Sequence, residues 1–105
     1  MIPELILAGL GAAVVAKKKT TKRYAVLSEI KRGAGAGAIG VAFLTTNRND
    51  ALKWATNACE AIVTVSDSFD HFENVPFDKA SHPTFVKVLS CEGENNRIVY
   101  VIVEF

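Results

Sequence analysis

An apolar segment followed at once by a basic cluster divides this chain of 105 residues into two unequal parts. No charged residue occurs from Leu5 to Ala16, and five of the seven residues over 17–23 are cations. Apolar segments with bases on one flank insert into membranes with the basic flank on the cytoplasmic side. The sequence therefore predicts a hydrophobic, membrane-anchoring helix with a basic flank over residues 1–23, and a small cytoplasmic domain over residues 24–105.

The apolar segment is close to the minimum length for spanning a bilayer. A helix over residues 2–16 would be about 22 Å long, against a hydrocarbon core of about 30 Å, and lysine stems that reach outward extend it to about 28 Å. The residues expected to contact the membrane are Ile2, Leu5, Ile6, Leu7, Leu10, Val14 and Val15. At about −0.5 kcal/mol each, they contribute about −3 to −4 kcal/mol toward insertion, so a single-pass transmembrane helix is feasible.

Two other interpretations of this segment stay open. It could form a soluble helix that docks on the domain or on a partner protein. It could also be a signal peptide with residues 14–16 as an acceptable cleavage site, although Glu4 stands where such peptides carry bases. If the segment is in a membrane, Gly9 and Ala13 have the small-xxx-small spacing that lets helices pack closely, which predicts self-association.

The charge of the chain is unevenly distributed, although its net value is only +1. Residues 1–32 carry seven bases and two acids, a net +5, whereas residues 33–105 carry five bases and nine acids, a net −4. A basic cluster beside an apolar segment is typical of binding to anionic lipid headgroups. The cations expected at the headgroups are Lys17, Lys18, Lys19, Lys22 and Arg23. Nucleic acid is not an expected partner, because no such cluster recurs in the domain.

The domain is large enough for one hydrophobic core but not for two. About eighty residues follow the basic cluster, which is near the size at which burial only marginally exceeds the entropy cost of folding. Cys59 and Cys91 form neither a CxxC motif nor a disulfide framework, and each lies in an apolar pattern. We therefore expect two buried thiols and no disulfide.

One amphipathic helix is predicted from Asp50 onward. The segment 47–50 supplies capping residues, and small or apolar side chains then recur with helical spacing. The residues on this apolar face are Leu52, Ala55, Cys59 and Ile62, flanked by Ala51, Ala58 and Val63. Trp54 lies beside the face and is expected to pack at the edge of the core.

Four strands are predicted around this helix, over residues 24–30, 41–46, 85–91 and 98–105. The last two are joined by turn-forming and charged residues over 92–97, which predicts a hairpin. Residues 98–105 are apolar on both faces, so this strand should be central or covered on both sides. The expected fold class is α+β, with one helix packed on a mostly antiparallel sheet of about four strands.

Glycine and alanine alternate over residues 33–38, between the first two predicted strands. Gly35, Gly37 and Gly40 match the GxGxxG pattern of phosphate-binding loops, but that motif opens a helix and a strand is predicted to follow here. A loop or a thin hairpin is the favoured interpretation. A third interpretation places residues 33–44, which lack any charge, at the membrane interface.

Residues 66–83 lack periodicity and collect side chains that can bind divalent cations: Asp67, Asp70, His71, Glu73, Asp78 and His82. Their spacing matches neither an EF-hand loop nor HExxH, so solvated charges are the simpler explanation. Phe69, Phe72, Val75 and Phe77 indicate that the loop packs on the domain or forms a short helix over 67–72. If these side chains are exposed instead, they would bind a partner.

These features favour a small non-enzymatic, membrane-anchored adaptor or structural subunit of a larger assembly, including lipid-containing or viral ones. Its expected partners are membrane lipid and a protein, or a second copy of the chain. The alternative is a soluble small-ligand or metal-binding domain that uses the loop from Gly33 to Gly40 or the loop from Asp67 to His82. No catalytic residue and no cofactor are predicted, because His71 and His82 have no evident orienting partner beyond adjacent acids.

Overall fold

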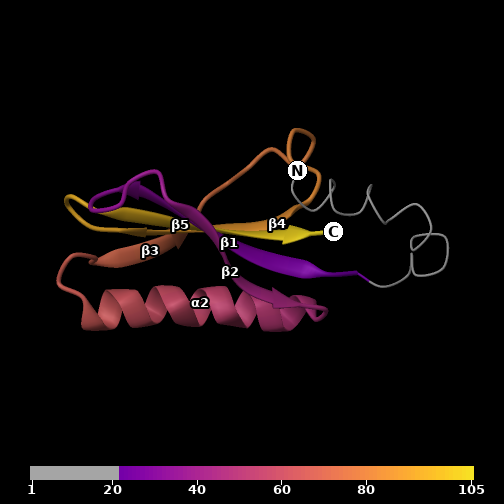
Figure 1. The fold of residues 1–105 in the computed structure, drawn as a ribbon, viewed down its shortest axis with the longest axis horizontal. Helices are drawn as coiled ribbons and strands as arrows, with labels where there is room; N and C mark the ends of the chain where they lie inside the picture. Colours follow the sequence, from indigo (N-terminus) through magenta and orange to yellow (C-terminus); the bar gives the residue numbers. More distant parts are fainter. Residues whose placement is uncertain (1–21) are drawn as a thin grey trace.

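The computed structural model describes residues 22–105, which form one helix packed on one sheet (Figure 1). The elements are β1 (Tyr24–Arg32), β2 (Ile39–Thr45), α2 (Arg48–Val65), β3 (His71–Asn74), β4 (Phe85–Glu92) and β5 (Arg97–Glu104). All neighbouring strands are antiparallel, and their order across the sheet is β2-β1-β5-β4-β3. The protein is therefore a small α+β domain, as the sequence predicts.

The helix α2 begins where its sequence supplies a cap. The Asn47 side chain accepts a hydrogen bond from the backbone N–H of Asp50 at 3.1 Å, which satisfies one of the donors that a helix leaves open at its start. Ala51, Ala55 and Cys59 are completely buried against the sheet. Two of these three are alanines, so the helix backbone can approach the sheet closely, and the predicted helix face is confirmed.

The core lies between α2 and one face of the sheet. Its strand residues are Tyr24 and Val26 of β1, Leu89 and Cys91 of β4, and Tyr100 and Ile102 of β5. Trp54 of α2 stacks on Phe43 of β2, with ring centroids 5.5 Å apart, and meets Tyr100 edge-on at 5.9 Å. The expectation that Trp54 packs at the core is confirmed.

The strand β5 is the middle strand of the sheet, as its apolar character on both faces predicts. Ile102 lies on the α2 side and is completely buried, while Val99 and Val103 lie on the opposite face and are 6% exposed. Both sides of this strand are therefore largely excluded from solvent. It pairs over nearly its whole length with β1 and with β4.

The sheet has five strands, and the expectation of about four is corrected by β3. This strand lies within the segment expected to be irregular, and the short helix considered over 67–72 is not formed. His71, Phe72, Glu73 and Asn74 pair in register with Glu92, Cys91, Ser90 and Leu89 of β4. Phe69 and Phe72 pack against the core, so this part of the loop packs on the domain as predicted.

The segment that follows β3 crosses to the side of the sheet away from α2 (Figure 1). Phe85 pairs with Val103, and so lies on that face. Phe77 meets the Phe85 ring at 5.5 Å and His82 stacks on it at 4.5 Å. This segment therefore covers the face at the start of β4.

The predicted membrane-anchoring helix lies outside the described residues, apart from Lys22 and Arg23 at the end of its basic flank. Among the residues that the structure describes, no helix combines the length and the apolar composition that crossing a membrane requires.

Candidate functional site

Three large aliphatic side chains of β2 lie together on the face of the sheet opposite α2. Ile39, Val41 and Leu44 are 68%, 56% and 62% exposed. In register, they pair with Glu29, Leu27 and Ala25 of β1 respectively, which alternate with the core residues of that strand. We call these three side chains the β2 surface. On the described sheet, these are the large hydrophobic side chains that remain exposed. Exposed apolar surfaces of this kind mark interaction sites.

A bulge in β2 places these side chains on one face. Val26 of β1 pairs with Phe43 and the next residue, Leu27, pairs with Val41, so Ala42 is the extra residue. Ala42 and Phe43 both pack toward α2. Simple alternation would put Val41 and Leu44 on opposite faces, and the bulge brings them to the same one.

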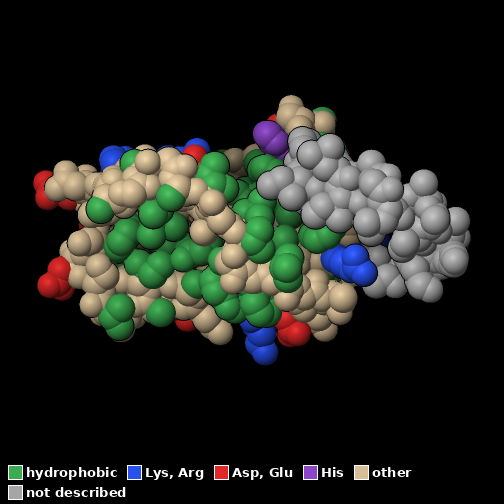
Figure 2. Space-filling model, in the orientation of Figure 1, with side chains coloured by type: hydrophobic (Ala, Val, Ile, Leu, Met, Phe, Trp, Pro, Cys, Tyr) green, Lys and Arg blue, Asp and Glu red, His purple; other side chains and the backbone are tan. Residues whose placement is uncertain are grey.

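The strand β2 and its flanking residues carry no charge, and the nearest charge on the same face is Glu29 of β1, which pairs with Ile39. No charged residue occurs over 33–47, which includes the turn, β2 and the start of the connection to α2. In Figure 2 the middle of the visible face, between α2 and the segment 75–84, carries mostly hydrophobic side chains, and charged side chains lie toward its rim. An apolar area of this kind has little to hold a polar ligand in a fixed orientation.

Cations are located at both ends of the β2 surface. Because Tyr24 pairs with Thr45, Lys22 and Arg23 lie beside the end of β2, where Arg48 also follows. Lys31 and Arg32 end β1 and so lie beside the start of β2. All five of these cations are exposed. Ion pairs join Lys22 to Glu104 at 3.4 Å and Lys31 to Glu29 at 3.1 Å.

The two edges of the sheet differ in charge. Residues 22–48, which include β1 and β2, carry five cations and one acid, a net +4. Residues 66–83, which include β3, carry one cation and four acids, a net −3. Because β2 and β3 are the two edge strands, the domain has one basic and apolar edge and one acidic edge.

The loop from Gly33 to Gly40 has the geometry of a hairpin turn. Gly33, Gly35 and Gly37 have φ angles of 107°, 82° and 96°, a region that glycine adopts without strain. The N–H of Gly37 donates to the carbonyl of Ile30 at 2.7 Å, and β2 follows directly. A phosphate-binding loop requires the N-terminus of a helix at this point. The interpretation as a hairpin is confirmed, and the dinucleotide motif has no structural support.

The predicted metal-binding residues of the 66–83 loop are spread along it. Asp70 contacts the His71 ring, and this hydrogen bond raises the pKa of His71. Asp78 accepts hydrogen bonds from the Ser81 hydroxyl at 2.8 Å and the Ala80 N–H at 3.1 Å, which lower the pKa of Asp78. Within residues 22–105, no three His, Cys, Asp or Glu side chains are grouped so that they could hold a metal ion.

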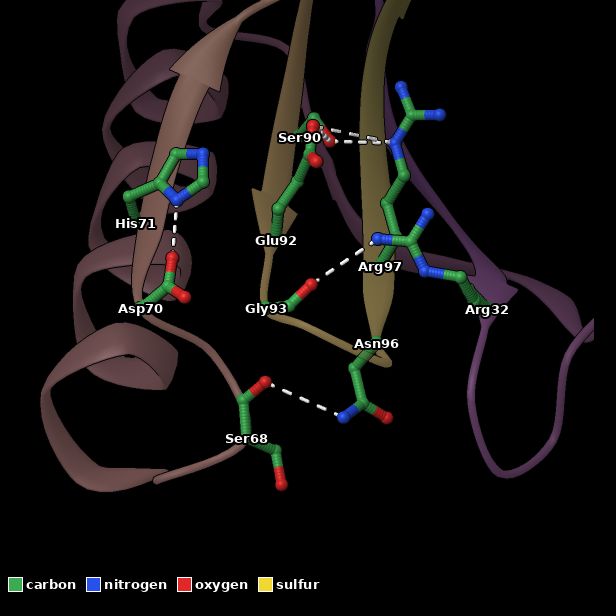
Figure 3. A network of polar contacts seen from close by, with 9 residues as sticks. All are labelled: Arg32, Ser68, Asp70, His71, Ser90, Glu92, Gly93, Asn96 and Arg97. Carbon is green, nitrogen blue, oxygen red and sulfur yellow. Dashed lines mark hydrogen bonds and ion pairs between the residues drawn. The ribbon is translucent and has the colours of Figure 1, made fainter.

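A network of polar contacts joins the end of β1 to the turn between β4 and β5 (Figure 3). Arg97 Nε donates to Ser90 Oγ at 2.9 Å, Ser90 Oγ donates to Glu92 Oε2 at 3.1 Å, and Arg97 and Glu92 form an ion pair at 3.7 Å. Arg32 donates to the Gly93 carbonyl at 3.3 Å, which links β1 to the turn after β4. These groups satisfy one another, so the network is a structural one.

The two cysteines are free thiols in the core, as the sequence predicts. Cys59 of α2 and Cys91 of β4 are both completely buried. The hydrogen bond with Cys91, together with burial, raises the pKa of the Cys59 thiol. The contact with Cys59 lowers the pKa of Cys91 in turn. Reactive cysteines lie in partly exposed sites, whereas both of these thiols are enclosed in the core.

No family model, no curated protein and no solved structure matches this chain. The chain's own residues are therefore the basis for assigning its function. Of the predicted site, Lys22 and Arg23 are described and exposed, whereas the predicted membrane-contacting residues and Lys17, Lys18 and Lys19 are outside the described range. The third interpretation of residues 33–44, at a membrane interface, already includes the β2 surface, and its signal is the absence of charge. The sequence does not show that Ile39, Val41 and Leu44 share one exposed face, because this depends on the bulge at Ala42.

Proposed function

We propose that this protein is a small non-enzymatic, membrane-anchored adaptor or structural subunit. The observation that carries this proposal is the uncharged run from Leu5 to Ala16 followed by five cations over residues 17–23. The apolar run inserts into the bilayer, and the cations bind the headgroups of its cytoplasmic leaflet. The domain of residues 24–105 is then held on the cytoplasmic side.

The start of the described domain suits attachment at a membrane. Lys22 and Arg23 are exposed, and β1 begins at the next residue. The basic cluster thus continues into the sheet with almost no intervening chain, so the domain cannot move far from the headgroups. A short connection of this kind serves an adaptor that must present a surface close to the membrane.

Protein contacts of such a subunit would use the surfaces that the domain leaves open. The edge strand β3 is short and flanked by acids, and a strand of a partner can pair with an exposed edge. Gly9 and Ala13 would allow the anchors of several copies to associate in the bilayer. Both contacts suit a subunit that repeats within a lipid-containing assembly.

Fractionation of the full chain tests this proposal. We expect the chain, expressed in bacterial cells, to sediment with membranes and to resist first a high-salt and then a carbonate wash. The variant Leu7→Asp/Leu10→Asp should be released, because each acid near mid-membrane costs about 2.5–3.5 kcal/mol and their sum exceeds the estimated driving force for insertion.

The matched control is Val65→Asp, which introduces an acid at a side chain of α2 that is 81% exposed. It should remain with the membranes like the unmodified chain. Release of the unmodified chain by salt alone would contradict the insertion of residues 2–16, and equal retention of the Leu7→Asp/Leu10→Asp variant would do the same.

A further inference from the structure

The geometry points to a second membrane contact: we propose that the β2 surface lies on the anionic headgroup region of the same bilayer that holds the anchor. This inference rests on the proposed anchoring. The occupant of the surface is therefore lipid, and the domain is fixed with its β2 edge toward the membrane and its β3 edge toward the cytoplasm.

The chemistry of the β2 surface matches a lipid interface. Ile39, Val41 and Leu44 are more than half exposed and lie on one face. Segments that bind at a membrane interface combine an apolar surface with cations that contact anionic headgroups. Here Lys22, Arg23 and Arg48 lie at one end of the strand and Lys31 and Arg32 at the other. Apolar side chains can enter the interface while the cations remain among the phosphates.

The charge of the two sheet edges selects the same orientation. The segment 22–48 has a net charge of +4, and the segment 66–83 has a net charge of −3. A negatively charged membrane surface attracts the first and repels the second. Because β2 and β3 are at opposite edges of the sheet, these two forces turn the domain in the same direction.

The point of attachment adds a third constraint. The basic cluster enters the sheet at the start of β1, which is the immediate neighbour of β2. In the register of the hairpin, Tyr24 lies opposite Thr45, so the chain leaves the anchor beside the β2 surface. The anchor and the β2 surface can therefore contact one bilayer at the same time.

A second copy of the chain fits the β2 surface less well. Two β2 surfaces packed face to face with their strands antiparallel would place the end that carries Lys31 and Arg32 against the partner's end that carries Lys22, Arg23 and Arg48. Like charges at both ends of the contact oppose such a dimer. Anionic lipid has the complementary charge.

Site-specific fluorescence on the full chain tests the inference. The variants Val41→Cys, on the β2 surface, and Glu73→Cys, on the acidic edge, each carry one exposed thiol, because Cys59 and Cys91 are completely buried. Each variant is labelled with an environment-sensitive fluorophore and bound to vesicles of phosphatidylcholine mixed with phosphatidylglycerol. Some of the lipids carry a spin label in the headgroup region, which quenches nearby fluorophores.

We expect the label at position 41 to be quenched several-fold more strongly than the label at position 73. The difference should shrink in vesicles of phosphatidylcholine alone, because the cations then lose their partners. Circular dichroism of each labelled variant verifies that the domain is folded. Equal quenching at the two positions would overturn the inference, and so would a label at position 41 that is shielded before any vesicles are added, which would assign the surface to a second copy.

The outcomes separate this inference from the proposed function. If the full chain does not bind vesicles at all, the anchor itself fails. If it binds and the label at position 41 is not quenched, the anchor stands and the contact of the β2 surface with lipid is wrong.

Discussion

Phe43 of β2 stacks on Trp54 of α2 with ring centroids 5.5 Å apart and ring planes only 9° from parallel. This contact joins the edge strand to the helix across the core, on the face of β2 opposite to the exposed Val41 and Leu44. One short strand thus carries two different surfaces, an inner one that stabilises the fold and an outer one that is free to bind. The bulge at Ala42 places Ala42 and Phe43 on the inner surface and leaves Val41 and Leu44 on the outer one.

Truncation of the inner surface should destabilise the domain. Phe43→Ala removes the ring that stacks on Trp54 and should lower the free energy of unfolding by about 2–4 kcal/mol, somewhat less than a fully buried phenylalanine because Phe43 is only partly buried. Urea unfolding followed by the emission of Trp54, the one tryptophan of the chain, measures the effect. Val65→Ala, at an exposed end of α2, is the control and should change stability little. A Phe43→Ala variant as stable as the unmodified chain would contradict this packing.

The buried thiols should be unreactive while the domain is folded. Cys59 and Cys91 have no exposed surface, so a reagent reaches neither sulfur atom while α2 lies on the sheet. We expect a thiol reagent at neutral pH to modify neither cysteine in the native protein and both in concentrated urea. Rapid modification of one thiol under native conditions would show that the contact between α2 and β4 opens easily.

Low pH should weaken the contact between the start of β1 and the end of β5. Tyr24 Oη donates to Glu104 Oε2 at 2.9 Å, and this bond, with Lys22 nearby, lowers the pKa of Glu104. A carboxyl with a lowered pKa in the folded state stabilises the protein above its unfolded pKa of about 4.3, and this stabilisation is lost as the pH falls through the lower folded value.

Tyr24→Phe should therefore have a lower urea midpoint than the unmodified protein at pH 7, and the gap should narrow toward pH 3. Glu94→Gln, in the exposed turn after β4, is the control and should leave the midpoint nearly unchanged. A gap that is constant across this pH range would mean that the hydrogen bond does not depend on the ionised carboxylate.

A side chain at Gly93, in the turn between β4 and β5, should destabilise the domain. A Cβ atom there would lie 1.8 Å from the backbone carbonyl oxygen of Ser68, so the segment before β3 would have to move. We expect Gly93→Ala to cost about 1–3 kcal/mol in urea unfolding. Gly40→Ala is the matched control, because its Cβ meets nothing within 4 Å. Equal midpoints for the two variants would show that the segment at Ser68 adjusts without cost.

Much of this fold follows from local sequence patterns. The helix is predicted from Asp50, because its apolar face repeats with helical spacing over about three turns. Its true start at Arg48 follows from the cap at Asn47. The central position of β5 follows from its apolar side chains on both faces. In each case the pattern is long enough that burial of one face decides the structure.

Two features could not be predicted, because contacts distant in sequence determine them. The strand β3 is four residues long and only Phe72 among them packs on the core, so its extended form depends on pairing with β4. The β2 surface depends on the bulge at Ala42, which shifts the alternation of side chains within an apolar strand. The four residues of β3 have a composition that a loop could also have. The residues around Ala42 carry no sequence signal of a bulge.

The central claim is that residues 2–16 hold the domain on the cytoplasmic side of a membrane. Cysteine accessibility tests it most directly, because the native thiols are buried and Glu94→Cys adds one exposed thiol in the turn after β4. We predict that a membrane-impermeant maleimide labels this variant in inverted membrane vesicles and not in intact spheroplasts. Labelling in intact spheroplasts, or recovery of the variant in the soluble fraction, would contradict the claim.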